Sequence, residues 1–308
     1  MDTNTGITEP GQAEPQGADP AGTPEIAVII PHYNDVARLE RCLVELMKND
    51  LEGAEILVVD NASPDPPDRL KPRFPRVRFL TEPEKGAGPA RNRGVAESSA
   101  PVLAFIDADC VPAEDWVATA RAVAPRADLI GGRVDVFDET PPPRSGAEAF
   151  EKVFAFNFRD YVERQGFSGA GNLVTTRAVF LDVGGFRTGV SEDNDWSLRA
   201  TAKGYRLIYE DGLKVSHPSR ADWAELRRKW LRLSQESFAL NDTGGASRLR
   251  WALKALAMPA SALVHMPKVF FSPKLDGLGE RMRAAGVLVR LRLRRMAWML
   301  RQATGGKL

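Results

Sequence analysis

The sequence predicts an α/β fold: a Rossmann-like, mostly parallel sheet flanked by helices, with a basic helical appendage at the C-terminus. Three observations predict it. Short apolar segments alternate with segments of helical periodicity, as in chains that cross from one parallel strand to the next. The apolar segments are continuous, as expected for strands buried on both faces. Polar motifs follow the strands directly, where open α/β sheets bind ligands.

Four strands are expected in the first part of the chain. The apolar segments that predict them cover residues 26–30, 56–59, 77–80 and 102–106. Helices are expected over residues 35–48, 90–98 and 113–123. On the first helix the apolar residues share one side, at Val36, Leu39, Leu43 and Leu46. Strands joined through helices favour parallel neighbours.

The pattern becomes looser after residue 136. One helix is expected over residues 147–163, and another over residues 192–203. The first carries an aromatic stripe at helical spacing, at Phe150, Phe154, Phe158 and Tyr161. Such a stripe is more typical of core packing than of a ligand site. Two short strands are expected over residues 206–209 and 214–216.

Composition divides the chain into three parts. Residues 1–24 are rich in Gly, Pro, Ala and acids, have almost nothing to bury, and are expected to be a disordered tail. Residues 25–220 carry the pattern of the sheet. Residues 221–308 are expected to be helical, and residues 226–308 contain 17 Lys and Arg against 4 Asp and Glu, a balance of +13 in a chain of net charge +1. This asymmetry points to an anionic partner.

Neither a secretory signal nor a disulfide framework is expected. The N-terminus lacks a basic segment followed by an apolar one. The chain has two cysteines, of which Cys42 falls on an apolar helix face and Cys110 follows a pair of acids. The cytosol is therefore the expected compartment.

Asp107-Ala108-Asp109 is the most informative motif. It follows the fourth expected strand, and side chains at i and i+2 of a strand point to the same side. Two carboxylates this close repel each other unless a cation lies between them. Oxygen ligands suit Mg²⁺ or Mn²⁺. Taken alone, the motif is more simply a solvated turn, so its weight comes from the other motifs.

Polar motifs also follow the other strands. Pro31-His32-Tyr33-Asn34 follows the first, and Asp60-Asn61-Ala62-Ser63 follows the second. A Gly-rich segment over residues 86–94, which contains Arg91, opens a helix after the third. The carboxyl ends of parallel strands meet at one edge, so these motifs are expected to converge on one crevice. An Arg near a helix start can face a diphosphate there.

Read together, these segments resemble the family 2 glycosyltransferases, which have the GT-A fold. The resemblance covers about residues 26–218. It rests on six motifs in the family's order: Val-Ile-Ile-Pro-His-Tyr-Asn, Val-Val-Asp-Asn-Ala-Ser, Gly-Pro-Ala-Arg-Asn-Arg-Gly, Asp-Ala-Asp, Val-Gly-Gly-Phe and Ser-Glu-Asp-Asn-Asp-Trp. Arg187 departs from the family, which usually has an acid or Asn after Gly-Gly-Phe. The Gln-x-x-Arg-Trp motif of polymerising members is not spelled out, so transfer of a single sugar is expected.

The resemblance implies a binding site for a nucleotide-diphosphate sugar. Pro31, His32, Tyr33 and Asp60 would hold the base, and Arg91 would help to hold the nucleotide. These roles come from the matching family motifs.

The resemblance also implies a divalent metal, Mn²⁺ or Mg²⁺. Asp107 would face the ribose or the sugar, and Asp109 would bind the metal. His217, which ends a late strand, would add a second metal ligand, although a structural His held by backbone hydrogen bonds is the alternative. Imidazole is better suited to Mn²⁺ than to Mg²⁺.

The implied catalytic base is Asp193. A sugar hydroxyl is a poor nucleophile and needs a proton acceptor within hydrogen-bond reach. Gly184, Glu192 and Trp196 would shape the acceptor loop. The alternative is that Glu192, Asp193 and Asp195 only cap a helix, because acids are favoured in a first turn.

The C-terminal part contains two apolar stretches. In the first, over residues 251–271, the longest run without Asp, Glu, Lys or Arg is 13 residues. A membrane-spanning helix needs ~20 apolar residues, so no span is expected. The second, over residues 281–302, contains seven Arg.

As a helix, residues 281–302 would place Val289, Leu293, Met296 and Leu300 on one side. A basic amphipathic helix that also carries Trp298 is typical of a membrane-surface element. A basic helix packed on the domain is one alternative, and a strand over residues 289–294, where apolar and basic residues alternate, is another. Nucleic acid is not expected as a partner, because no recognised module accompanies the charge.

The expected function is metal-dependent, inverting transfer of one sugar from a nucleotide-diphosphate sugar to a hydroxyl of a glycan or lipid-linked acceptor. An anionic membrane surface is the expected partner of the basic C-terminal part, with the protein peripheral on the inner face of the plasma membrane. A nucleotidyltransferase is one alternative, but it needs a basic Gly-rich signature after the first strand. A catalytically inactive, membrane-associated scaffold of the same fold is another.

Overall fold

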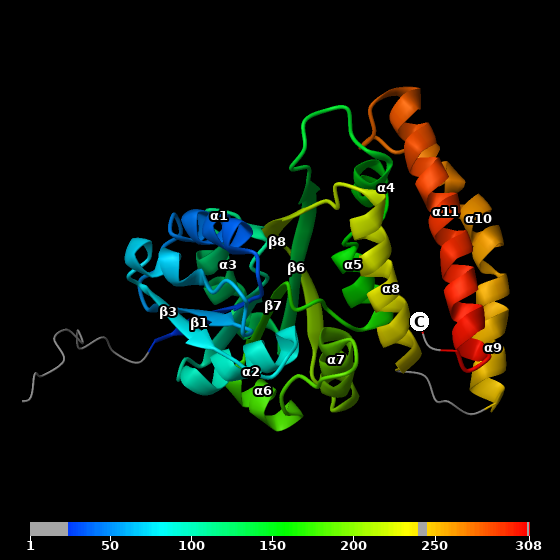
Figure 1. The fold of residues 1–308 in the computed structure, drawn as a ribbon. Helices are drawn as coiled ribbons and strands as arrows, with labels where there is room; N and C mark the ends of the chain where they lie inside the picture. The colour runs from blue at the N-terminus through cyan, green and yellow to red at the C-terminus, as the bar shows by residue number, and fades with distance from the viewer. Residues whose placement is uncertain (1–23, 240–244, 307) are drawn as a thin grey trace, which may run out of the picture.

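The computed structural model describes residues 24–239, 245–306 and 308, and it has an α/β architecture (Figure 1). An eight-stranded sheet runs in the order β3-β2-β1-β4-β7-β6-β8-β5. Its strands are β1 (Ile26–His32), β2 (Ala54–Asp60), β3 (Val77–Thr81), β4 (Val102–Ile106), β5 (Val111–Pro112), β6 (Leu129–Phe137), β7 (Asn172–Thr176) and β8 (Leu207–Pro218). The four predicted strands of the first part are confirmed as β1 to β4, and they pair in parallel.

Helices cover both faces of this sheet, which explains the continuous apolar strands. In β1, Val28 and Ile30 pack toward α1 (Val36–Leu46) and α3 (Trp116–Val123), and Ile29 packs toward the opposite face. That opposite face is covered by α2 (Ala87–Glu97), α6 (Arg177–Val183) and α7 (Glu192–Ala202). Short turns of helix occur at η1 (Pro67–Arg73) and η2 (Ala124–Arg126).

The sheet is mixed beyond β4. β7 lies antiparallel between β4 and β6, β5 lies antiparallel to β8, and β6 and β8 are parallel. The two short strands expected over residues 206–209 and 214–216 are a single strand, β8. The polar residues between them occupy a register shift against β6, between Gly132 and Arg133. An irregularity of this kind interrupts the apolar pattern without ending the strand.

The single helix expected over residues 147–163 is wrong. The chain forms α4 (Gly146–Phe154), α5 (Phe158–Asp160) and a turn of π-helix, η3 (Tyr161–Gln165). The break comes at Phe156, whose φ of 54° lies in the left-handed region. The aromatic side chains therefore serve different partners: Phe150 packs on Trp230, and Phe156 packs on His217 with ring centroids 4.4 Å apart.

Four helices follow the sheet: α8 (Trp223–Ala239), α9 (Gly245–Leu256), α10 (Met258–Phe270) and α11 (Gly277–Ala303). Helices α4, α8, α10 and α11 share one hydrophobic core, to which Phe150, Leu226, Ala262 and Leu288 belong. Helix α11 lies between the rest of the molecule and the outer pair α9–α10 (Figure 1). In the described part of the chain, none of the helices is long and apolar enough to cross a bilayer.

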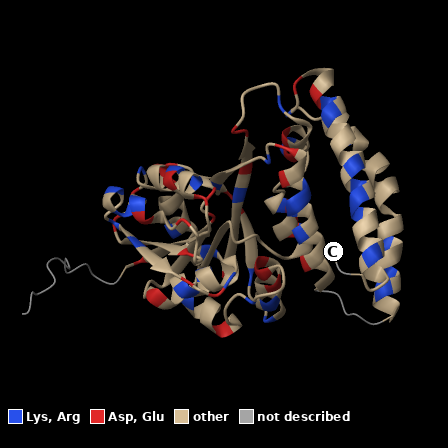
Figure 2. Cartoon of the chain, in the orientation of Figure 1, with Lys and Arg blue, Asp and Glu red and all other residues tan. Residues whose placement is uncertain are grey.

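The apolar side expected for residues 281–302 is partly wrong. These residues form a helix, not a strand, but Val289 and Leu293 are 37% and 46% exposed, whereas Leu291 and Trp298 are buried. Helix α11 has neighbours on two sides, so more than one stripe of it is covered. Lys and Arg line α11 even so (Figure 2). Two of its guanidinium groups stack on tryptophans of α8: Arg290 on Trp223 at 4.1 Å and Arg295 on Trp230 at 4.6 Å.

Candidate active site

A cavity of about 840 Å³ opens at the carboxyl edge of the parallel strands. Its walls come from the loop after β1, the start of α2, the residues after β4, the segment over residues 187–193, the end of β8 and one side of α8. The predicted residues that line it are Pro31, His32, Tyr33, Arg91, Asp107, Asp109, Glu192, Asp193 and His217. The expected convergence of the motifs on one crevice is therefore present in the structure.

His32 and Asp60 form a buried pair behind the nucleotide wall. His32 Nδ1 lies 2.8 Å from Asp60 Oδ1, and the backbone N–H of Asp35 donates to His32 Nε2 at 3.1 Å. Because Nε2 accepts, Nδ1 carries the proton and donates to the carboxylate. Asp60 also accepts from the backbone N–H and the hydroxyl of Ser63. Asp60 is not among the residues that line the cavity, so its visible role is to hold the loops after β1 and β2.

Asn61 occupies the wall position next to Asp60. Its amide group donates to the carbonyls of Glu82 and Glu84, at 3.0 and 2.6 Å, and accepts from the N–H of Gly86 at 2.7 Å. These bonds fix the loop before α2 against the end of β2. Sequence reasoning did not select Asn61, although its place directly after a strand was a usable signal.

Arg91 connects two of the motifs. Its guanidinium donates to Asp107 at 2.7 Å and to Glu192 at 2.8 Å, and the side chain is 4% exposed. Burial acts to lower the pKa of Arg91, but the carboxylates of Asp107 and Glu192 outweigh it and raise the pKa above its ordinary value. Arg91 is therefore a cation that holds two acids in place at the cavity wall.

Glycines allow these groups to approach closely. A Cβ at Gly171 would lie 2.6 Å from Asp107 Oδ2, and one at Gly88 would lie 3.2 Å from the Cβ of Phe186. Both distances are shorter than ordinary van der Waals contact. The Gly-rich motifs thus serve to bring the acid after β4 and the start of α2 close to neighbouring backbone.

Asp109 and His217 face each other across the ends of β4 and β8. His217 Nε2 lies 3.1 Å from Asp109 Oδ2, while Nδ1 lies 2.7 Å from the carbonyl oxygen of Pro218. A carbonyl can only accept, so Nδ1 carries a proton and Nε2 is directed at the carboxylate. Burial acts to raise the pKa of Asp109, but His217 and Arg220 lower it to about 2. Either a second imidazole proton or a metal ion is needed between the two groups.

This pair fits a divalent cation. A His that donates its other N–H to a backbone carbonyl is oriented as metal-binding imidazoles usually are. Within the described residues, no cluster of three or more His, Cys, Asp or Glu side chains could hold a metal by itself. Two protein ligands leave coordination positions for phosphate oxygens and water, as is usual for Mg²⁺-type sites.

Asp193 lies in the first turn of α7, at the cavity wall. Its Oδ1 accepts from the N–H of Asn194 at 2.8 Å and from the Ser191 hydroxyl at 3.1 Å. Burial, and then the neighbouring Glu192, raise the pKa of Asp193 above its ordinary value. A raised pKa suits a carboxylate that must take up a proton near neutral pH.

Gly184 and Trp196 lie behind the acceptor wall and do not line the cavity. Trp196 is fully buried, stacks on Phe180 and donates from its indole N–H to the carbonyl of Gly184 at 2.9 Å. Asn92 fixes the next residues: its amide donates to the carbonyl of Phe186 and accepts from the N–H of Phe186, both at 2.9 Å. These contacts set where the loop over residues 187–191 begins.

Helix α8 forms a wall that sequence reasoning missed. Arg232, Leu233, Gln235, Glu236 and Ala239 line the cavity opposite the sheet. Burial raises the pKa of Glu236 to about 7, Arg232 opposes this, and the carboxylates of Glu192 and Asp193 add to it. The carboxyl of Glu236 therefore responds to the charge of the candidate base. The basic pattern around residues 227–232 was the only signal for this wall.

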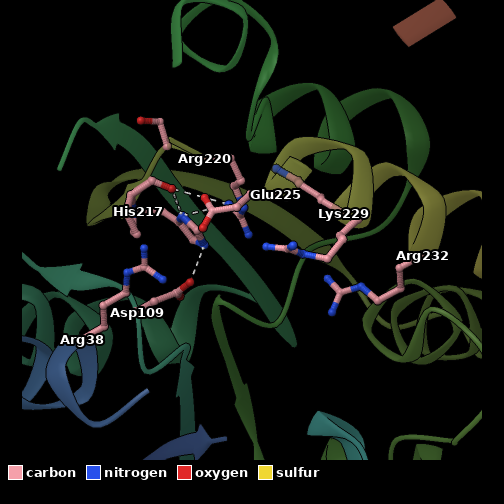
Figure 3. A pocket seen from close by; sticks show the side chains of 10 residues that line it. Arg38, Asp109, His217, Arg220, Glu225, Lys229 and Arg232 are labelled. Atoms are coloured by element: carbon pink, nitrogen blue, oxygen red, sulfur yellow. Dashed lines mark hydrogen bonds and ion pairs between the residues drawn. The ribbon is translucent and has the colours of Figure 1, made fainter. Parts of the chain in front are cut away.

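A second, basic pocket of about 310 Å³ adjoins the metal-binding pair (Figure 3). Its cations are Arg38, Arg220, Arg228, Lys229 and Arg232. Burial lowers the pKa of Lys229 to about 8, although Glu151, at 2.6 Å, opposes the shift. The cations outnumber the nearby acids Asp109 and Glu225, so the pocket favours an anionic group beside His217.

Comparison with known proteins agrees with this geometry. The profile described as Glycosyl transferase family 2 matches residues 27–186. Glycosyltransferase AglE of Haloferax volcanii is 30% identical over 223 residues, which cover 69% of this chain and 72% of AglE.

Two solved structures share the fold. The mannosyltransferase PcManGT of Pyrobaculum calidifontis, in complex with GDP-Man and Mn²⁺, has a TM-score of 0.55 and 19% identity, covering 94% of this chain and 78% of that one. S. aureus TarS residues 1–349, in complex with UDP-GlcNAc, has a TM-score of 0.52 and 15% identity, covering 91% and 87%.

Proposed function

The chain belongs to glycosyl transferase family 2, and on this premise we propose that it moves one sugar, a hexosyl group, from a nucleotide-diphosphate sugar to a hydroxyl of a glycan or lipid-linked acceptor, with inversion at the anomeric carbon. The observation that carries this proposal is the arrangement of Asp193, with its raised pKa, in the same cavity as Asp109 and His217. A proton acceptor and an anion-stabilising group thus face one space.

Asp193 acts on the acceptor. Its carboxylate accepts the proton of the acceptor hydroxyl as that oxygen attacks the anomeric carbon. The new carbon–oxygen bond forms on the face opposite the leaving group. The old bond breaks, and its electron pair leaves with the nucleoside diphosphate. General base catalysis of this kind contributes ~10²–10⁴-fold.

The departing diphosphate carries negative charge, and the site supplies positive charge beside it. Arg220 and Arg232 line both the main cavity and the basic pocket. Asp109 and His217 would hold Mn²⁺ or Mg²⁺, with Mn²⁺ favoured by the imidazole. A cation bound there would supply electrostatic stabilisation of the diphosphate. Arg91 keeps Asp107 oriented toward the donor.

Related structures bind different donors. PcManGT was solved with GDP-Man and TarS with UDP-GlcNAc. In this chain, Pro31, His32 and Tyr33 form the wall where the base would lie, with Tyr33 59% exposed and free to contact it. Peripheral attachment at the inner face of the plasma membrane would bring the site to lipid-linked acceptors.

Calorimetry with a panel of nucleoside diphosphates tests the proposal. We expect one of them to bind only with Mn²⁺ or Mg²⁺, and Asp109→Ala to abolish that binding. A matched variant, Asp128→Ala, changes a carboxylate that bonds to the backbone N–H of Arg206 away from the cavity and should leave binding intact. Failure of every diphosphate to bind with either metal would instead favour an inactive scaffold.

A further inference from the structure

Helices α9 and α10 carry a stripe of large apolar side chains that nothing in the described structure covers. Phe271, directly after α10, is 85% exposed, and Val264 and Leu263 are 73% and 72% exposed. Six such residues follow one another at helical spacing: Leu249, Leu253, Leu256, Leu263, Val264 and Phe271. Single exposed leucines are common on soluble proteins, but a continuous row marks an interaction site.

The stripe is distinct from the packed side of the same helices. Trp251, Ala255, Ala262 and Val269 are buried and belong to the cores shared with α11. Residues three or four apart lie on one face of a helix, so the exposed row and the buried row lie on different faces. In Figure 1, α9 and α10 form the layer farthest from the sheet. The stripe therefore faces outward.

The charge around the stripe has one sign. Residues 243–275 contain no Asp or Glu. They contain five basic residues, all exposed: Arg248, Arg250, Lys254, Lys268 and Lys274. Helices with large aliphatic side chains flanked by Lys and Arg lie in the plane of a membrane surface and are drawn to anionic lipids.

We propose that α9 and α10 dock on an anionic lipid surface, lying in its plane with the stripe inserted among the acyl chains and the bases at the headgroups. A second copy of this chain fits less well, because its stripe would bring five like charges against five. The docking surface deepens the proposed function, since it would place the cavity at lipid-linked acceptors, and it differs from the side of α11 that the sequence indicated.

A fluorophore can report the contact directly. Cys42 and Cys110 are fully buried, so a cysteine placed at an exposed position takes up a thiol-reactive, environment-sensitive dye selectively. We expect the dye on Leu263→Cys to shift to the blue with vesicles containing anionic phosphatidylglycerol. The dye on Leu181→Cys, 65% exposed on α6, serves as the control and should not shift. No shift at position 263 would overturn the proposal.

Vesicle sedimentation then separates the two components. The double variant Leu263→Gln, Phe271→Gln should bind anionic vesicles at least about tenfold more weakly, whereas Leu181→Gln should bind as the unaltered protein does. Lys254→Gln with Lys268→Gln should weaken binding to anionic vesicles and reduce its salt dependence. Equal binding to neutral and anionic vesicles would overturn the role of the bases. Dimers that dissociate in the Gln double variant would assign the stripe to a second copy.

This test is independent of sugar transfer, because no donor is added. Asp193→Asn should bind vesicles as the unaltered protein does. An enzyme that turns over donor but does not bind vesicles would refute only the docking surface. Vesicle binding without nucleotide binding would refute only the proposed function.

Discussion

Replacing Asn92 with Ala tests whether the segment after α6 positions the candidate base. The Asn92 side chain makes two hydrogen bonds to the backbone of Phe186, both at 2.9 Å. From Phe186 the chain runs through the loop over residues 187–191 into α7, where Asp193 begins to face the cavity. Without these bonds, we expect that loop and the first turn of α7 to shift.

The magnitude follows from the two bonds. Each contributes about 1 kcal/mol net, and leaving a buried N–H without a partner adds to the loss. We therefore expect Asn92→Ala to lower the free energy of unfolding by about 2–3 kcal/mol. Misplacement of a catalytic group by about 1 Å costs about 10²-fold in rate, so kcat should fall by about that factor at temperatures where the variant is folded.

Asn49 provides a matched control. It donates to the carbonyl of Ala113 at 3.1 Å and accepts from the N–H of Val117 at 2.9 Å, on the other face of the sheet and away from the cavity. Urea unfolding should show similar losses for Asn49→Ala and Asn92→Ala, whereas donor turnover should fall only for Asn92→Ala. Equal turnover in the two variants, or an equal loss in both, would refute a positioning role for Asn92.

Three further predictions concern the chemistry. Asp193→Asn should lower kcat by ~10²–10⁴-fold while donor affinity, measured by calorimetry, stays unchanged; full turnover would remove Asp193 as the base. Because the pKa of Asp193 is raised, kcat should fall as pH drops through that value, and Glu236→Gln, which removes a nearby negative charge, should move this acid limb to lower pH. An unmoved limb would mean that Glu236 does not influence the base. His217→Gln should weaken Mn²⁺-dependent diphosphate binding at least about tenfold, and unchanged metal dependence would leave His217 a structural role.

Much of the sheet could be predicted because its strands are buried on both faces. Residues 26–30 are apolar without interruption and all are fully buried, so β1 is evident from composition alone. The antiparallel place of β7 was not predictable in the same way, since pairing depends on partners distant in the chain. The break at Phe156 escaped because its neighbours keep helical spacing although they contact different elements.

The site shows the same division. Motifs that follow strands were placed correctly in one crevice, because the carboxyl ends of neighbouring strands meet there. The roles of individual side chains depended on contacts that spacing does not reveal. Asp60 bonds to His32 and Ser63 instead of lining the cavity, and Arg91 is held by two carboxylates. The wall from α8 was missed because it comes from residues assigned to the appendage.

That wall ties the C-terminal part to catalysis. Helix α8 presents Arg232 and Glu236 to the cavity, while its Leu226 is buried in the core that also contains residues of α10 and α11. Substitutions on the outward stripe leave this core intact, so they should alter vesicle binding without changing turnover of a soluble acceptor. Substitution of Leu226 should alter both, since a cavity in that core would displace α8. The boundary at residue 220 is therefore a boundary in composition, whereas the active site extends across it.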